Sequence, residues 1–131
     1  MAQLWHVGAF DPSLIGMADS FARPPERLSP SGLADPGRPY GRAMSVADIE
    51  STIADYANAV VAARAMGFDG VEIHGAHGYL PDQFLWTGTN QRTDDYGGSL
   101  RNRLRFAEQL LCACRRAASP DFVLSFRFSQ W

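Results

Sequence analysis

The feature that most constrains the fold is an alternation of short apolar stretches with long amphipathic ones. Two segments have the period of an amphipathic helix, and apolar stretches of strand length lie before, between and after them. The three stretches of strand length are Gln3–Val7, Phe68–Ile73 and Phe122–Phe128. A helix that connects two consecutive strands makes them parallel, with a right-handed crossover. The sequence therefore predicts a parallel α/β fold with about three strands and two long helices.

Both predicted helices follow a serine suited to the N-cap position. Ser45 precedes the first, which ends at Gly67, a residue typical of the left-handed position after a helix. Ser99 precedes the second, and Pro120 prevents its continuation. The apolar stripes consist of Val46, Ile49, Ile53, Tyr56, Ala57 and Val60 in the first helix, and of Leu100, Leu104, Ala107, Leu111 and Cys114 in the second.

Two long connections separate these elements. Gly8–Met44 is rich in Pro, Gly, Ser and Asp without a sustained period, which predicts a long loop close to an active site. His74–Gly98 is a second loop with a short apolar piece. Parallel strands need cover on both faces, and a closed (β/α)₈ barrel takes about 250 residues. If these 131 residues belong to a barrel, they make up close to half of one.

Composition narrows the function classes. The chain has 131 residues, a formal charge of -2 and 46% hydrophobic residues, which is typical of a globular protein. It has no concentrated basic field, so we expect a small-molecule partner and neither nucleic acid nor a membrane surface. Cys112 and Cys114 diverge on one helix, no signal segment opens the sequence, and no apolar run approaches the roughly 20 residues of a membrane helix. We therefore expect a cytoplasmic protein.

The strand before His74 ends in a cluster of chemically useful side chains. Ligands gather at the carboxyl ends of parallel strands, and Gly78 allows a tight turn that brings His74, His77 and Tyr79 to the same rim. Two imidazole donors can hold one carbonyl oxygen and stabilise negative charge that develops on it. A tyrosine phenol is protonated at neutral pH and can act as a proton donor.

An H-x-x-H pair can also bind metal. No carboxylate or cysteine lies at a complementary spacing, so the sequence favours no metal site. A metal-dependent barrel hydrolase that uses His74 and His77 is therefore a weaker hypothesis than a site that binds a carbonyl oxygen.

The surrounding sequence resembles the Old Yellow Enzyme family of FMN-dependent oxidoreductases. The resemblance is carried by Val71-Glu72-Ile73-His74-Gly75-Ala76-His77-Gly78-Tyr79-Leu80, Asp82-Gln83-Phe84-Leu85, Asn90-Gln91-Arg92-Thr93-Asp94-Asp95-Tyr96-Gly97-Gly98-Ser99 and Asn102-Arg103-Leu104-Arg105-Phe106. It extends more weakly to Gln3-Leu4-Trp5-His6-Val7-Gly8 and Phe126-Arg127-Phe128-Ser129. It implies a TIM barrel that binds FMN, takes electrons from NADH or NADPH and reduces the C=C bond of α,β-unsaturated carbonyl compounds.

Residue roles follow from the same motif positions. His74 and His77 match the pair that binds the substrate's carbonyl oxygen, and Tyr79 matches the proton donor. Gln3 matches the glutamine that hydrogen-bonds the flavin's pyrimidine side, and Arg127 matches the arginine near flavin N1 and O2. A charge between Phe126 and Phe128 in a buried strand would need such a partner.

The sequence departs from the family at two places and lacks parts of it. Pro81 replaces an ordinary apolar residue, so a short helix is expected to start there, and Trp86-Thr87-Gly88-Thr89 differs from the commonest form of its loop. The strands that hold the flavin phosphate in this family are missing. We therefore expect residues 1–131 to be a single incomplete domain, the central part of a flavin-binding (β/α)₈ barrel. The alternative is a non-catalytic truncated barrel fragment that cannot bind FMN alone.

Overall fold

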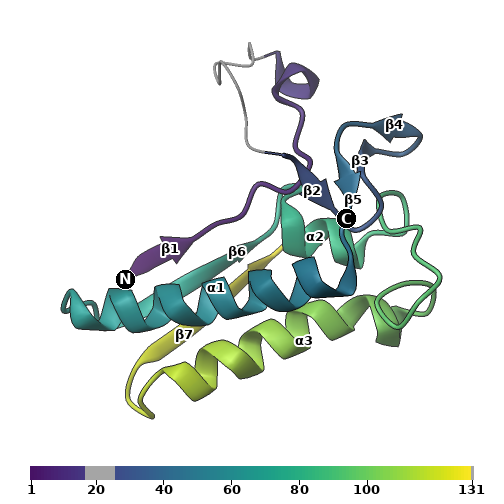
Figure 1. Ribbon diagram of the computed structural model, residues 1–131. Helices are drawn as coiled ribbons and strands as arrows, with labels where there is room; N and C mark the ends of the chain where they lie inside the picture. Colours follow the sequence, from purple (N-terminus) through teal and green to yellow (C-terminus); the bar gives the residue numbers. More distant parts are fainter. Residues whose placement is uncertain (17–25, 131) are drawn as a thin grey trace.

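The computed structural model describes residues 1–16 and 26–130 of the chain. Its centre is a parallel sheet with the strand order β1-β6-β7 (Figure 1). The three strands are β1 (Ala2–Leu4), β6 (Gly70–Gly75) and β7 (Val123–Phe128). The two long helices are α1 (Val46–Ala65), between β1 and β6, and α3 (Leu100–Ala117), between β6 and β7. The predicted parallel α/β fold is confirmed.

Both helices begin where the sequence predicts. Ser45 and Asp48 form a reciprocal capping box at α1, and Ser99 accepts a hydrogen bond from the backbone N–H of Asn102 at α3. Gly67 follows α1 with a φ of 83°, in the left-handed region that favours glycine. The local chemistry of these residues therefore sets the start of both helices and the end of α1.

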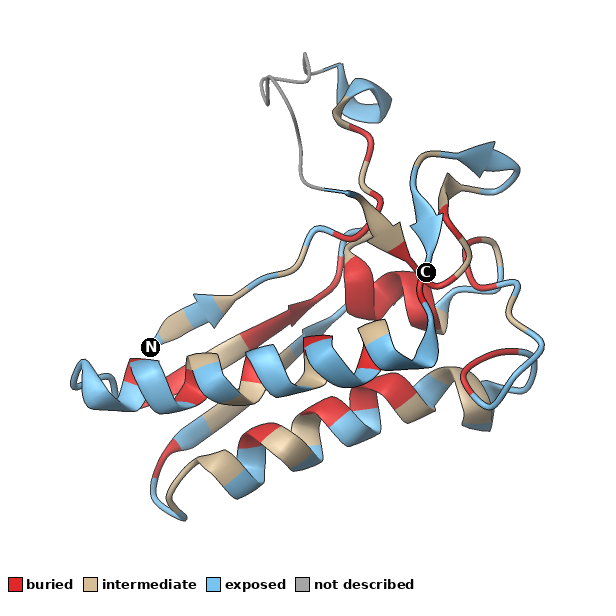
Figure 2. Ribbon diagram, in the orientation of Figure 1, coloured by how far each residue is buried: buried red, intermediate tan, exposed pale blue. Residues whose placement is uncertain are grey.

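The core lies between the sheet and the two helices, which cover the same face of the sheet and pack on each other (Figures 1 and 2). Val71 and Ile73 of β6 are fully buried on that face. Because side chains alternate along a strand, Glu72 and His74 lie on the opposite face. In β1 the residues packed against the core are Ala2 and Leu4. The sheet therefore has one covered face and one face that carries polar groups.

Two sequence predictions about the core are wrong in detail. The first strand is Ala2–Leu4 and not Gln3–Val7, and Trp5 and Val7 are 55% and 39% exposed. In α3, Leu100 and Leu104 are exposed, whereas Phe106 and Leu110 are fully buried. The ring of Phe106 stacks on Phe84 with a centroid distance of 4.2 Å, so a contact from a distant segment decides which side of α3 faces inward.

The segment predicted as a long loop contains short elements. They are a 3₁₀ helix η1 (Pro12–Ile15) and the strands β2 (Leu28–Ser29), β3 (Leu33–Asp35), β4 (Arg38–Pro39) and β5 (Arg42–Ala43). β2 pairs in parallel with β5, and β3 pairs antiparallel with β4. The part of this loop at residues 17–25 lies outside the described residues. These elements gather near the carboxyl end of β6, beside the short helix α2 (Leu80–Leu85) (Figure 1).

Helix α2 begins one residue before the predicted start at Pro81. Tyr79 occupies its N-cap position, and Pro81 lies within the first turn, where a missing backbone N–H leaves no hydrogen bond unmade. Among the described residues, no helix is long and apolar enough to cross a membrane.

Candidate active site

His74 lies at the carboxyl end of β6, with 6% of its surface exposed. Its ring is edge-on to those of His77 and Tyr79, with centroid distances of 5.2 and 5.0 Å. Gly75 is required beside it, because a Cβ there would lie 2.5 Å from the ring of Phe126 in the neighbouring strand. The close approach of β6 and β7 therefore places His74 at a tightly packed strand end.

A tight turn brings His77 and Tyr79 back toward His74. His77 and Gly78 both have positive φ, 60° and 77°, and a positive φ is uncommon for a residue other than glycine. The backbone N–H of His77 donates to Ser129 Oγ at 2.9 Å. The N–H of Gly78 donates to Asp82 Oδ2 at 2.9 Å, and its carbonyl accepts from Gln83 Nε2 at 2.7 Å. Contacts from α2 and from the end of β7 thus hold the turn in this conformation.

Tyr79 is held in a group of aromatic rings. Trp5 is edge-on to it at 4.9 Å between centroids, and Phe10 is tilted against it at 5.1 Å. His74 also contacts Tyr79, so three rings from different parts of the chain pack around it. Such contacts restrict the orientation of the phenol, which is what a positioned proton donor requires.

Arg127 is opposite His74 in the register of β7 and β6, and its Nη2 lies 3.4 Å from Nε2 of His77. The expectation that this arginine is buried is wrong, because Arg127 is exposed and Phe128 is 56% exposed. The next row of the same face holds Gln3 and Glu72, which are paired in the register of β1 and β6. Gln3 Nε2 donates to Glu72 Oε1 at 2.7 Å.

Burial disfavours the charged form of His74. Loss of hydration lowers the pKa of His74 from its ordinary value, and His77 and Arg127 lower it further. The ring is therefore neutral at neutral pH. Its Nδ1 atom is buried and has no hydrogen-bond partner among the described residues. A buried polar atom of this kind costs free energy unless a partner satisfies it, so the site is suited to a hydrogen-bonding ligand.

The loop after α2 is fastened by side chains that hydrogen-bond the backbone. Asn90 Nδ2 donates to the carbonyls of Phe84 and Tyr96, at 2.7 and 2.8 Å. Arg92 donates to the carbonyl of Pro30 at 2.9 Å and also to that of Met44. These residues of the conspicuous Asn90–Ser99 motif are structural and do not enter the site.

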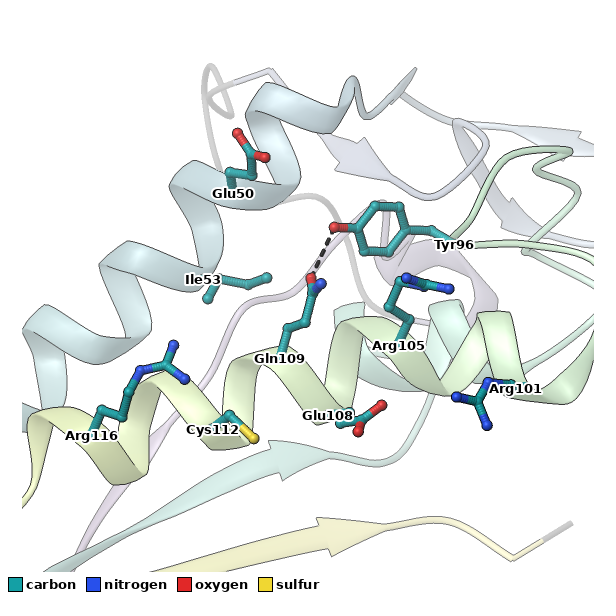
Figure 3. Close-up of a pocket in the computed structure, with 9 residues that line it drawn as sticks. All are labelled: Glu50, Ile53, Tyr96, Arg101, Arg105, Glu108, Gln109, Cys112 and Arg116. Atoms are coloured by element: carbon teal, nitrogen blue, oxygen red, sulfur yellow. Dashed lines mark hydrogen bonds between the residues drawn. The ribbon is translucent and has the colours of Figure 1, made fainter.

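Another groove, of about 680 Å³, lies between α1 and α3 (Figure 3). Tyr96 donates to Gln109 Oε1 at 2.8 Å on its wall, and Arg101, Arg105 and Arg116 contribute cations. It contains none of the site residues predicted from the sequence. In the described part of the chain, no three His, Cys, Asp or Glu side chains gather in a way that could hold a metal ion.

Comparison with known proteins decides the family. The model of the NADH:flavin oxidoreductase / NADH oxidase family matches residues 1–131. The chain belongs to this family. It is 45% identical over 131 residues to chanoclavine-I aldehyde reductase of Penicillium roqueforti, covering 98% of this chain and 33% of that protein. It is 39% identical over 127 residues to 12-oxophytodienoate reductase 2 of Arabidopsis thaliana, covering 92% of this chain and 34% of the relative.

A solved structure agrees with this membership. Morphinone reductase in complex with tetrahydroNAD superimposes with a TM-score of 0.78 at 35% identity, over 96% of this chain and 38% of that one. The fold is therefore part of a TIM barrel, as predicted. The chain spans about a third of the length of the curated relatives it matches. The resemblance to the Old Yellow Enzyme family is confirmed.

The residues on the face of the sheet opposite the helices fit the flavin of this family. Gln3 offers both a hydrogen-bond donor and an acceptor, and Arg127 offers a permanent cation on the strand at the other side of β6. His74, whose Nδ1 has no partner among the described residues, belongs to β6, the strand between these two. Donor, acceptor and cation thus lie on one face, as the hydrogen-bonding side of an isoalloxazine ring requires.

Sequence reasoning found the strand end and the turn but missed the neighbours of Tyr79. The contacts of Trp5 and Phe10 with the ring of Tyr79 were not predicted. Trp5 has the same parity as Gln3 in the extended segment, which places both on one face and was the signal available. No comparable pattern marks Phe10.

Proposed function

We propose that this chain is part of a longer FMN-dependent NAD(P)H oxidoreductase that reduces the C=C bond of α,β-unsaturated carbonyl compounds. The observation that carries the proposal is the convergence of His74, His77 and Tyr79 at the carboxyl end of β6. The family of the chain supports it, because a relative of Leishmania infantum, 50% identical over 106 residues, has the name probable flavin mononucleotide-dependent alkene reductase.

His74 and His77 bind the carbonyl oxygen of the substrate. A neutral imidazole has one N–H donor, and two such donors stabilise the negative charge that develops on the oxygen during reduction. The guanidinium of Arg127 can only donate, so its contact with Nε2 of His77 favours the tautomer with the proton on Nδ1. Arg127 therefore also orients His77.

Tyr79 donates a proton to the alkene carbon. Its ring is held by Trp5, Phe10 and His74, so the phenol oxygen has few orientations to search before the transfer. Removing a positioned proton donor slows catalysis by about 10²- to 10⁴-fold.

Gln3 and Arg127 would hold FMN, with Gln3 on the pyrimidine side and Arg127 near N1 and O2. Bound FMN would supply the electrons for the reduction after accepting them from NADH or NADPH. Glu72 fixes the orientation of Gln3, since its carboxylate can only accept and so takes the amide N–H of the carboxamide.

The domain organisation, the partner and the location that we propose follow from the same function. Residues 1–131 form a single incomplete domain, the central part of a flavin-binding barrel. The partner is a small activated alkene and not nucleic acid or a membrane, and the low cysteine content, Cys112 and Cys114, supports a cytoplasmic location. The alternative is that the chain exists as a non-catalytic fragment that does not bind FMN alone.

The decisive experiment uses the longer enzyme that contains this chain. The expected results are a flavin absorbance spectrum and oxidation of NAD(P)H that depends on 2-cyclohexenone. Tyr79→Phe should lower kcat while FMN stays bound, and Tyr96→Phe, which removes a phenol far from the site, should leave kcat unchanged. A colourless protein that remains inactive with added FMN would contradict the proposed function.

A further inference from the structure

A second cavity lies directly beside the turn that carries His77 and Gly78. Its volume is about 460 Å³, within the range of roughly 300–1,000 Å³ that is typical of sites for small molecules. It is lined by residues of the segment after β1, the β3–β4 hairpin and α2. The lining residues used below are Phe10, Leu14, Asp35, Asp82, Gln83 and Trp86.

The cavity presents an apolar surface to a ligand. Phe10, Leu14 and Trp86 contribute rings and an aliphatic side chain, and Leu14 and Trp86 are each 42% exposed. Two polar groups of the wall, those of Asp82 and Gln83, already have partners. Asp82 and Gln83 bind the backbone of Gly78 at 2.9 and 2.7 Å. An apolar ligand would therefore displace water from this surface without leaving these polar groups unpaired.

The cavity adjoins the proposed active site through shared residues. His77 lines it and also contacts His74, and Phe10 lines it while its ring packs 5.1 Å from that of Tyr79. A molecule held by His74 and His77 can therefore extend past His77 and Phe10 into this space.

Charge restricts what the occupant can be. Two carboxylates, those of Asp35 and Asp82, belong to the lining, and neither arginine nor lysine does. An anionic group would be repelled by both. The occupant that fits therefore carries no anionic group and presents an apolar surface.

Trp86 is the side chain best placed to contact an apolar occupant of the cavity. It follows α2, and its indole lies against Gly88, where an added Cβ would be 2.8 Å from the ring. Glycine at position 88 thus leaves room for the indole in its present place.

We propose that this cavity binds the non-reacting apolar part of the substrate, an inference that rests on the proposed function. The substrate class is then narrower: α,β-unsaturated carbonyl compounds that carry an apolar ring or chain without an anionic group. Trp86 and Leu14 determine this preference and take no part in the chemistry.

The test compares 2-cyclohexenone with cyclohexenones that carry a phenyl, hexyl or carboxyalkyl group, in the longer enzyme. The parent enzyme should have a lower KM for a phenyl or hexyl compound than for 2-cyclohexenone, and a carboxyalkyl compound should have no such advantage. Trp86→Ala should raise KM for the favoured compound about tenfold, in line with the loss of an apolar contact in a pocket, and leave kcat and KM for 2-cyclohexenone unchanged.

Two further variants guard against a folding defect. Gly88→Ala displaces the indole without removing it and should raise the same KM. Leu100→Ala truncates an exposed leucine on α3 and should leave the KM of both substrates unchanged. Equal KM changes for substituted and unsubstituted cyclohexenone would overturn the proposal. If 2-cyclohexenone is not reduced at all, the proposed function fails. Calorimetry then tests the cavity without the reaction, by measuring the Kd of the saturated phenylcyclohexanone. A Kd that Trp86→Ala does not change would overturn the proposal that the cavity binds this compound.

Discussion

His74 is a histidine whose surroundings favour the neutral imidazole. Burial and the neighbouring His77 and Arg127 lower its pKa in the folded chain, whereas an unfolded histidine has a pKa of about 6.5. As the pH falls below about 6.5, the unfolded chain takes up a proton before the folded one does, so the free energy of unfolding decreases. His74 therefore couples the stability of the fold to the acidity of the solution.

Replacing His74 with a residue that does not titrate should weaken this dependence. We predict that His74→Gln shows a smaller loss of unfolding free energy between pH 7.5 and pH 5 than the unchanged chain, measured by urea denaturation. His6 gives a second case, because burial lowers its pKa too, against the opposing effect of Asp55. His6→Gln should reduce the dependence independently, and an unchanged pH dependence in His74→Gln would contradict the prediction.

Gly75 is a position where space, and not backbone conformation, demands glycine. A Cβ there would lie 2.5 and 2.6 Å from two ring atoms of Phe126 and 2.9 Å from the carbonyl oxygen of Arg127. We predict that Gly75→Ala lowers the unfolding free energy by about 1–3 kcal/mol, as overpacking does. Adding Phe126→Leu should recover part of this loss, because it removes the ring but not the backbone contact. Additive effects of the two changes in a double-mutant cycle would show that the ring is not the cause.

At the scale of helices and strands, the sequence succeeded where short-range chemistry decides. Serine caps, a glycine stop and the apolar run before His74 located α1, α3 and β6 to within a few residues. It failed where distant contacts decide. Strands of two residues such as β2 and β5 exist only through their pairing, so no local period marks them. The apolar stripe predicted for α3 was rotated because Phe84 selects Phe106 as the buried side chain.

The first turn of α1 shows how local chemistry supports an element. Asp48 accepts from the backbone N–H of Ser45 at 2.7 Å, and Ser45 Oγ accepts from the N–H of Asp48 at 3.1 Å. Hydrogen bonds from Arg42, and then from Ser45, hold the pKa of the Asp48 carboxyl well below its usual range. The box is therefore intact at neutral pH and its contribution is lost only in acid, as Asp48 takes up a proton.

Removing one cap should destabilise the chain measurably. We predict that Ser45→Ala lowers the unfolding free energy by about 0.5–2 kcal/mol at pH 7, since a capping hydrogen bond is lost and Asp48 loses a partner. Ser99→Ala is the matched control at α3, where the serine accepts a single bond and no reciprocal acid is present, and it should have the smaller effect. The comparison needs only thermal or urea unfolding of the two variants. Equal losses would show that the acidic half of the box adds nothing.

At the scale of the whole molecule, the described residues form a sheet that helices cover on one face only. β1 and β7 are the two edges of the strand order β1-β6-β7, and each pairs with β6 alone. The face opposite the helices carries Gln3, Glu72 and Arg127, and Val123 of β7, which has the same parity as Arg127, is 50% exposed. A parallel sheet is stable when both faces are covered, and unpaired edges invite further strands. The arrangement therefore suits a chain that continues the barrel on both sides.

This incomplete sheet predicts how the 131-residue chain behaves by itself. Gln3 and Arg127 can contact only one side of a flavin, so the gain in free energy on binding is small. We expect a fluorescence titration to show no saturable FMN binding in the micromolar range, whereas the longer enzyme should bind FMN tightly enough to retain it during purification. Arg127→Gln in that enzyme should weaken FMN binding, because a cation that faces the flavin is lost, and Arg101→Gln on the outer surface of α3 should not. Saturable micromolar binding by the 131 residues would instead show that three strands suffice to hold the cofactor and that the missing strands add affinity but not the site itself.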